Sequence, residues 1–316
     1  MNILVIGTGA VGSFYGSLLA RQGADVSVMA RSDYSFIREQ GIDVHSETAL
    51  GDYHFHPVAV LKPGEVPLNQ PDYVLLCTKV VEGADRVGLL RSVVGSETRI
   101  VLISNGVEIE AAIRQAYPQQ ALISGLAFVC VSRIAPGKIR HQSEGRLVLG
   151  DFPSGLSPET RALADVFGQS GIRCQATPDI ITARWQKCVW NAAFNPLSVL
   201  SGGLDTASML ETGQPFVRVL MEEICRIAAA LGHPLSADLV DRMIENTRAM
   251  PPYKTSMLLD FEAGRALETE AILGNAVRAG RRAGVSIPHL ESVYALMQFR
   301  EKTRLRECAD AQGQAE

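Results

Sequence analysis

Three polar residues recur at helical spacing in an otherwise apolar stretch between Trp185 and Pro196. Lys187, Asn191 and Asn195 are four residues apart, so on a helix they form one polar row. A helix that is apolar nearly all round is normally buried, which would place the row inside the protein or facing a cleft. A buried lysine gives up its proton more readily than one in water. The row therefore indicates a proton donor beside two amides; the alternative is a solvated helix face.

A second polar element, Thr255 and Ser256, begins a helical pattern that continues to about residue 283. One of the two is expected to cap this helix, and a capped N-terminus is also a natural seat for a substrate carboxylate. Glu268 lies on the apolar side of the same predicted helix, so its carboxylate needs a partner. Arg265, one turn earlier, is one candidate partner. A substrate hydroxyl or the lysine of the polar row is the other.

The first thirty residues suggest a nucleotide site by position as well as by motif. A glycine motif directly follows a strand predicted at residues 2–6, opens a helix and precedes a second strand at 25–30. Its glycines permit a tight turn and close approach to a pyrophosphate, and the helix N-terminus favours phosphate. This order indicates a dinucleotide site rather than a plain glycine-rich turn. The candidate cofactor-binding residues of the motif are Gly7, Thr8, Gly9, Ala10, Val11 and Gly12.

The end of the second strand indicates which dinucleotide is bound. NAD sites usually place Asp or Glu about 20 residues past the glycines, where it holds the ribose hydroxyls. This chain has Arg31 and Ser32 after the strand. A guanidinium with a nearby hydroxyl can bind the 2′-phosphate of NADP(H). We expect NADP(H) as the cofactor; the alternative is that Arg31 is only a solvated surface residue.

Two further polar residues follow strands predicted near 72–77 and 99–104. Lys79 comes after the first of these strands and Asn105 after the second. Open α/β sheets bind ligands at the carboxyl ends of their parallel strands. Both residues are therefore candidates for the cofactor site, and Asn105 also for the substrate site, although Asn105 and Gly106 alone would be an ordinary turn signal.

The elements that must position these residues fall into two groups. In the first half, short apolar runs alternate with amphipathic ones, which predicts a Rossmann-type, doubly wound sheet. Two β-rich runs, 121–134 and 138–150, meet at a Pro-Gly turn and are expected to pair as antiparallel strands. Strand patterning then ceases, and helices are expected at 180–200, 206–232, 236–248, 256–283 and 289–304.

The predicted fold class is therefore α/β, with an N-terminal Rossmann-type sheet and an all-helical C-terminal domain. A chain of 316 residues is long for one core and suits two. We expect an NADP(H)-binding domain at 1–177, a helical substrate-binding and catalytic domain at 178–305 and a disordered tail at 306–316.

Composition narrows the partners. A net charge of -4 and a pI near 5.9 remove the broad electrostatic reason to expect nucleic acid or an anionic membrane. No run approaches the roughly 18 apolar residues that span a membrane, so a cytoplasmic location is expected. The six cysteines are scattered, which indicates free thiols in a reducing compartment and no metal cluster.

Taken together, these motifs resemble the ketopantoate reductase family over the chain to about residue 300. The likeness rests on the glycine motif, Arg31, Thr78-Lys79, Asn105-Gly106, the stretch from Trp185 to Pro196, and the segment from Ser256 to Glu268. The spaced lysine, asparagines and proline are far more specific than the glycine motif. The resemblance implies NADPH-dependent reduction of 2-dehydropantoate (ketopantoate) to (R)-pantoate, in pantothenate and coenzyme A biosynthesis.

The resemblance also implies a role for each candidate. Lys187 would be the general acid, and Glu268 would hold substrate and the lysine in place. Asn191, Asn195 and Ser256 would bind substrate, while Lys79 and Asn105 would lie beside the nicotinamide and substrate. A hydride arriving at a ketone builds an alkoxide, which a nearby cation stabilises and protonates.

Two departures from the family pattern leave the substrate open. Glu108 stands where the family commonly has a second glycine, and residues 267–275 depart from its usual sequence. The alternatives are an NADP(H)-dependent reductase of another 2-oxo or 3-hydroxy acid and a non-catalytic NADP(H) sensor. The expected partner is a small-molecule 2-oxo acid substrate. The apolar helical domain leaves a homodimer open.

Overall fold

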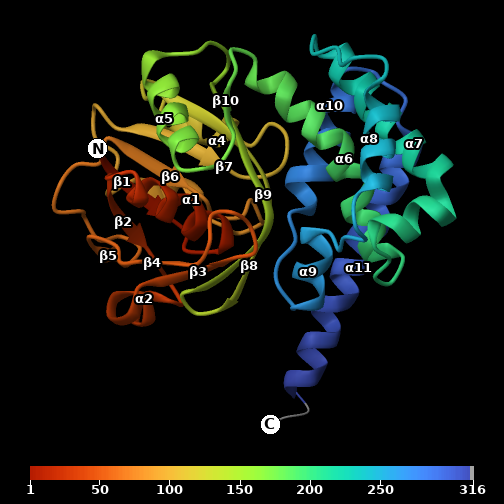
Figure 1. The fold of residues 1–316 in the computed structure, drawn as a ribbon. Coiled ribbons are helices and arrows are strands. Elements are labelled where there is room, and N and C mark those ends of the chain that lie inside the picture. The colour runs from red at the N-terminus through yellow and green to blue at the C-terminus, as the bar shows by residue number, and fades with distance from the viewer. Residues whose placement is uncertain (314–316) are drawn as a thin grey trace. The chain divides into compact units, whose positions relative to one another are not determined.

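The computed structural model describes the backbone of residues 1–313 and the side chains of residues 1–304 (Figure 1). The chain divides into two compact units. The first contains Met1–Asn105 and Ile109–Ile181, and the second contains Gly106–Glu108 and the chain from Thr182 onward. The division lies four residues after the predicted boundary, and a three-residue segment from the first half joins the second unit.

The first unit is built on a ten-stranded sheet (Figure 1). Its order is β4-β3-β9-β8-β7-β6-β1-β2-β5, with β10 paired to β9. The strands from β8 through β5 in that order are parallel to one another. The strands are β1 (Asn2–Ile6), β2 (Asp25–Met29), β3 (Ile42–Ser46), β4 (Tyr53–Phe55), β5 (Val60–Leu61), β6 (Tyr73–Leu76), β7 (Arg99–Ile103), β8 (Leu122–Ala135), β9 (Lys138–Asp151) and β10 (Cys174–Ala176).

Helices cover both faces of this sheet because its central strands are apolar on both sides. In β1, Ile3 and Val5 belong to a core shared with α1 (Ala10–Arg21) and α5 (Pro158–Gln169). Leu4 and Ile6 belong to a second core shared with α3 (Arg86–Leu90) and α4 (Ala111–Ala116). A short helix, α2 (Tyr34–Gln40), follows β2. The predicted doubly wound sheet is confirmed.

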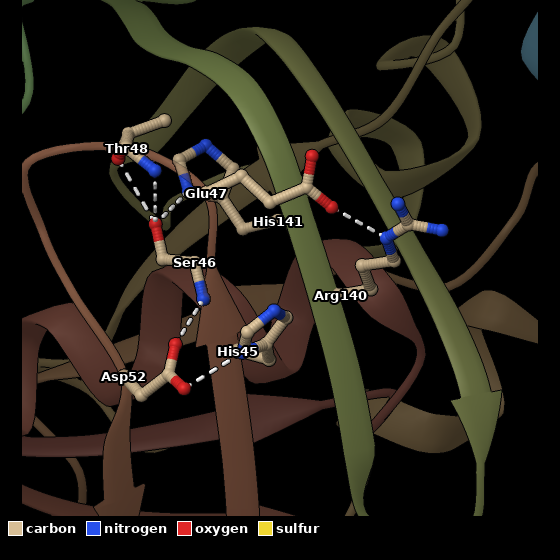
Figure 2. A network of polar contacts seen from close by, with 7 residues as sticks. All are labelled: His45, Ser46, Glu47, Thr48, Asp52, Arg140 and His141. Carbon is tan, nitrogen blue, oxygen red and sulfur yellow. Dashed lines mark hydrogen bonds and ion pairs between the residues drawn. The ribbon is translucent and has the colours of Figure 1, made fainter.

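The predicted antiparallel pair is β8 and β9, joined at Pro136 and Gly137. The first part of β9 also pairs with β3. A polar network stabilises the pairing of β3 with β9 (Figure 2). Ser46 Oγ and His141 Nδ1 are 2.8 Å apart, Ser46 N donates to Asp52 at 2.9 Å, and Arg140 Nε donates to Glu47 at 2.6 Å. The first and third contacts join the start of β9 to β3 and the residue that follows it, and the second holds Ser46 in place.

The regular elements described in the second unit are helices, which confirms its predicted class. None of the helices within residues 1–313 is long and apolar enough to cross a membrane. They are α6 (Ile180–Leu200, whose first two residues belong to the first unit), α7 (Thr206–Ala230), α8 (Leu239–Ala249), α9 (Ser256–Glu262), the π-helix η1 (Glu270–Gly274), α10 (Asn275–Arg282) and α11 (Pro288–Gly313).

The single helix predicted from 256 to 283 is wrong. The chain leaves α9 at Gly264, whose φ of 67° lies in the left-handed region that ends helices. Glu268 therefore does not share a helix face with the start of α9; it directly precedes the short helical segment that begins at Thr269. Arg265, one of the two alternative partners considered for Glu268, donates to Asp260 at 2.8 Å.

The end of the chain also differs from expectation. Helix α11 continues through Gly313, beyond residue 305, after which we expected a disordered tail. Residues 314–316 lie outside the described residues. Five cysteines are free thiols, and the sixth, Cys308, lies where side chains are not described. The free thiols are Cys77, Cys130, Cys174, Cys188 and Cys225.

Candidate active site

The glycine turn between β1 and α1 is tightly packed on one side and open on the other. A Cβ atom at Gly12 would lie 2.1 Å from the Gly7 carbonyl oxygen, so only glycine fits there. At Gly9, by contrast, a Cβ would meet nothing within 4 Å. Gly9 is the N-cap of α1 and has no side chain to cap the first N–H groups. These residues fit a pyrophosphate, which would accept from uncapped N–H groups at the helix N-terminus.

Two hydroxyls beside this turn support the same assignment. Ser13 Oγ, in the first turn of α1, and Thr78 Oγ1, just after β6, are buried. Neither atom has a hydrogen-bond partner among the described residues. Buried polar atoms are normally satisfied, so the turn has polar capacity that a bound ligand or water would use.

The other predicted cofactor residues lie at the same edge of the sheet. Arg31 follows β2, Lys79 follows β6 and Asn105 follows β7. Because β2, β1, β6 and β7 are adjacent parallel strands, their carboxyl ends share one edge with the glycine turn. Arg31 is exposed. Ser32, expected to help bind phosphate, instead donates its hydroxyl to Asp33 at 2.8 Å.

In the second unit, the polar row lies along α6. Asn191 and Asn195 are only 8% and 2% exposed, and Lys187 is partly buried. The solvated-face alternative is therefore wrong for both asparagines. Asn195 Oδ1 is buried and has no hydrogen-bond partner among the described residues. A ligand bound at the end of the row would satisfy this acceptor by donating a hydrogen bond to it.

The start of α9 lies beside the end of that row. Thr255, not Ser256, is the N-cap, since its Oγ1 accepts from Leu258 N at 3.2 Å. The same atom is 2.7 Å from Ser198 Oγ, and Ser198 in turn donates to the Asn195 carbonyl at 2.7 Å. Ser256 is exposed and free of the capping role. Ser256 and Asn195 are thus held in neighbouring segments.

The segment after Glu268 packs against the Lys187 end of the row. Cys188 Sγ donates to the carbonyl of Ile272 at 3.7 Å, and Ile272 N donates to the Glu268 carbonyl at 3.0 Å. Burial raises the pKa of the Cys188 thiol to about 12, so this neighbour of Lys187 is neutral at physiological pH. The two predicted catalytic residues therefore come from segments in contact.

Sequence reasoning missed Arg184, which is 2% exposed. It lies three residues before Lys187 and extends the polar row by one turn, a spacing that could have revealed it. Its Nη1 donates to the Gly106 carbonyl at 2.9 Å. Asn275 holds the same loop by donating to the Val107 carbonyl at 2.7 Å. Both residues position the segment that follows Asn105.

Glu108 ends this loop with a φ of 55°, in the left-handed region that favours glycine. Its carboxylate pairs with Arg282 of α10. The backbone here explains why a glycine is common at this position in the family that the sequence resembles. Among the described residues, no group of three or more His, Cys, Asp or Glu side chains could hold a metal ion.

Comparison with known proteins agrees with these features. Family models described as ketopantoate reductase PanE/ApbA and its C-terminal part match residues 3–154 and 179–301. A 2-dehydropantoate 2-reductase of Nostoc sp. is 30% identical over 301 residues, 93% of either chain.

Solved structures agree as well. One of 2-dehydropantoate 2-reductase from Methylococcus capsulatus has 60% identity and a TM-score of 0.92, covering 96% of this chain and 98% of that one. One from Geobacter metallireducens has 34% identity and a TM-score of 0.88, covering 95% and 100%. The chain belongs to the ketopantoate reductase family.

Proposed function

We propose that this protein is an NADPH-dependent 2-dehydropantoate 2-reductase, which reduces ketopantoate to (R)-pantoate for pantothenate and coenzyme A biosynthesis. The observation that carries the proposal is the likeness of both units, over nearly the whole chain, to proteins of that name. The buried row on α6, with an unsatisfied Asn195 acceptor, supports it from this chain's own residues.

When bound, NADPH supplies the hydride that reduces the substrate carbonyl. In the first unit, the glycine turn (Gly7, Thr8, Gly9, Ala10, Val11 and Gly12) would bind the pyrophosphate and Arg31 the 2′-phosphate. Lys79 and Asn105, at the ends of β6 and β7, would lie toward the nicotinamide and substrate.

In the second unit, Lys187 would stabilise the developing alkoxide and protonate it. Asn191, Asn195 and Ser256 would bind the substrate's polar groups, and Glu268 would orient the substrate and the lysine. Each of these roles is a proposal that a single substitution can test.

A panel of oxo acids tests the proposed reaction. Purified protein is mixed with NADPH and each of several 2-oxo acids, and the loss of NADPH absorbance is followed. Ketopantoate is expected to give the highest kcat/KM. A higher value with another oxo acid would favour the alternative reductase. Tight NADPH binding with no turnover across the panel, or with 3-hydroxy acids and NADP⁺, would favour the sensor.

We further propose that the protein is a homodimer, as the apolar helical unit allows. Light scattering after size-exclusion chromatography measures the mass of the protein in solution. A mass of twice 34.1 kDa is expected, and a mass near 34.1 kDa would contradict the homodimer. The predicted cytoplasmic location stays a prediction.

A further inference from the structure

A buried carboxylate follows β2 by four residues, shortly after the strand end at which NAD-binding enzymes carry their acidic residue. Asp33 comes two residues after Arg31 and is 3% exposed. It occupies the N-cap position of α2, but its side chain makes no capping hydrogen bond. Left bare, this negative charge would repel a 2′-phosphate and attract ribose hydroxyls. An enzyme that uses NADPH must therefore neutralise it.

Arg133 performs that neutralisation from a distant part of the sequence. It lies near the end of β8, 100 residues after Asp33, and its Nη1 donates to both carboxylate oxygens. The Ser32 hydroxyl donates to the same carboxylate at 2.8 Å. The Arg133 side chain is 35% exposed and the Asp33 side chain 3%. The carboxylate of the pair is therefore buried, while the arginine is partly open to solvent.

Two further cations, Arg31 and Lys62, belong to segments next to Asp33. Lys62 follows β5, whose last residue accepts a backbone hydrogen bond from Ala30 N, next to Arg31. The Lys62 Nζ lies 4.8 Å from the centre of the Tyr34 ring, beside Asp33. With Asp33 balanced by Arg133, this edge keeps the cations Arg31 and Lys62 and one nearby carboxylate, that of Glu65, which accepts from Lys62 N at 2.8 Å. Such an edge suits a phosphate dianion.

The hairpin that carries Arg133 is held in place. Arg133 pairs with Ile139 across β8 and β9, and the following residues of β9, Arg140 and His141, are fixed to β3 by the network of Figure 2. The guanidinium therefore meets Asp33 from a rigid support rather than from a free loop.

We propose that Arg133 is a specificity-determining residue for NADPH, because it masks the Asp33 carboxylate that would otherwise select NADH. The inference rests on the proposed NADP(H) function and deepens it. Arg133 acts on the cofactor through Asp33, while Arg31 is the residue expected to bind the 2′-phosphate itself.

The test measures binding in the absence of any oxo acid. Isothermal titration with adenosine 2′,5′-bisphosphate (2′,5′-ADP) and with 5′-AMP, which differ only in the 2′-phosphate, gives the affinity ratio that reports this group. In Arg133→Met, which keeps most of the aliphatic stem, we expect that ratio to fall by about tenfold or more as Asp33 is exposed. The affinity for 5′-AMP is expected to stay within about threefold of the wild type, and the affinity for NADH is expected to rise relative to that for NADPH. An unchanged ratio would overturn the proposal.

A double variant separates masking from direct contact. In Asp33→Asn/Arg133→Met the charge to be masked is gone, so the affinity ratio should recover to within about threefold of the wild type. A double variant as poor as the single one would mean that Arg133 binds the phosphate itself, and the proposal would be wrong. The matched control is Arg99→Met, which breaks the ion pair with Glu159 at the start of β7, outside this hairpin, and should leave the ratio unchanged.

If Arg133→Met no longer binds 5′-AMP, the Asp33→Asn variant tests the proposal instead. It removes the acid and frees Arg133, so the affinity ratio should rise; an equal or lower ratio would refute masking. Failure of the proposed reductase activity is distinguishable, since it is read from ketopantoate turnover by the wild type rather than from nucleotide binding.

Discussion

Lys187 lies one helical turn before a buried asparagine and next to a thiol that burial keeps neutral. A cation in such surroundings can stabilise an alkoxide more effectively than one in water, because the local dielectric is lower. If Lys187 is the general acid, its removal must lower turnover much more than it weakens cofactor binding.

Replacing Lys187 by alanine is expected to lower kcat by about 10²- to 10⁴-fold. The Kd for NADPH should stay within about threefold, since the glycine turn and Arg31 bind the cofactor. Steady-state kinetics and titration calorimetry measure the two quantities. Lys302→Ala, an exposed lysine on α11, is the control and should resemble the wild type. Normal turnover by Lys187→Ala would refute its role.

Asn195 offers a separate test, because its Oδ1 is buried without a partner among the described residues. In Asn195→Ala, the KM for the oxo acid should rise by about tenfold or more, as one hydrogen bond to substrate is lost. The melting temperature should change little, since the removed acceptor satisfied nothing in the unliganded protein. A large fall in melting temperature with an unchanged KM would assign Asn195 to the core instead.

Residue spacing predicted the row on α6 but not its full length. Lys187, Asn191 and Asn195 were found because four-residue spacing is visible in a sequence. The same spacing could have revealed Arg184, three residues before Lys187, but its partner, the Gly106 carbonyl 78 residues away, is not visible in a sequence. Between Thr255 and Ser256, only the hydrogen bond to Leu258 N decides which caps α9.

At the scale of elements, the loop 106–108 is the clearest departure from the family pattern. A left-handed conformation costs a residue with a Cβ about 1–2 kcal/mol, whereas an exposed ion pair contributes about 0.2–1 kcal/mol. Backbone strain at Glu108 therefore outweighs its pair with Arg282.

Glu108→Gly should accordingly raise the free energy of unfolding, by up to about 1 kcal/mol. Glu108→Gln keeps the strain and loses the charge pair, so it should lower that free energy by less than about 1 kcal/mol. Urea unfolding measures both. A destabilised Glu108→Gly protein would mean that the contact with Arg282 is worth more than the strain.

We expect acid to lower the free energy of unfolding through His141, which lies where β3 pairs with β9. Burial lowers the pKa of His141 from its usual 6.5. The unfolded state therefore takes up a proton before the folded one, so stability is complete above pH 6.5 and falls as the pH drops below it. Urea unfolding at pH 7 and pH 5 should show this loss in the wild type, and His141→Gln should reduce it. An equal loss in His141→Gln would place the acid sensitivity elsewhere.

Strand and helix lengths explain which elements the sequence predicted. The central strands β1, β2, β6 and β7 are apolar runs between clear turn signals, and the long pair β8 and β9 is marked by Pro136-Gly137. Strands β4 and β5 contain only three and two residues, too few to show alternation. The break after α9 was missed because apolar residues on both sides of Gly264 keep a helical spacing, and a left-handed glycine is not visible in such a pattern.

In the whole molecule, the two units carry different parts of the function that the family resemblance implied. The first carries a glycine turn, a basic edge and a masked acid; the second carries a buried polar row and the segments packed against it. Neither set performs a reduction alone, so the central claim is that one chain transfers a hydride from NADPH to ketopantoate. The sequence and the fold show which family the chain belongs to. The chemical identity of the product tests whether the chain catalyses this reduction.

The most direct measurement follows the hydride. The wild-type protein is incubated with ketopantoate and NADPH that carries two deuterium atoms at C4 of the nicotinamide, and the product is examined by mass spectrometry and chiral chromatography. We expect (R)-pantoate with one deuterium at C2, formed in step with NADP⁺. Oxidation of NADPH without deuterated pantoate, or no reaction under conditions in which NADPH binds, would contradict it.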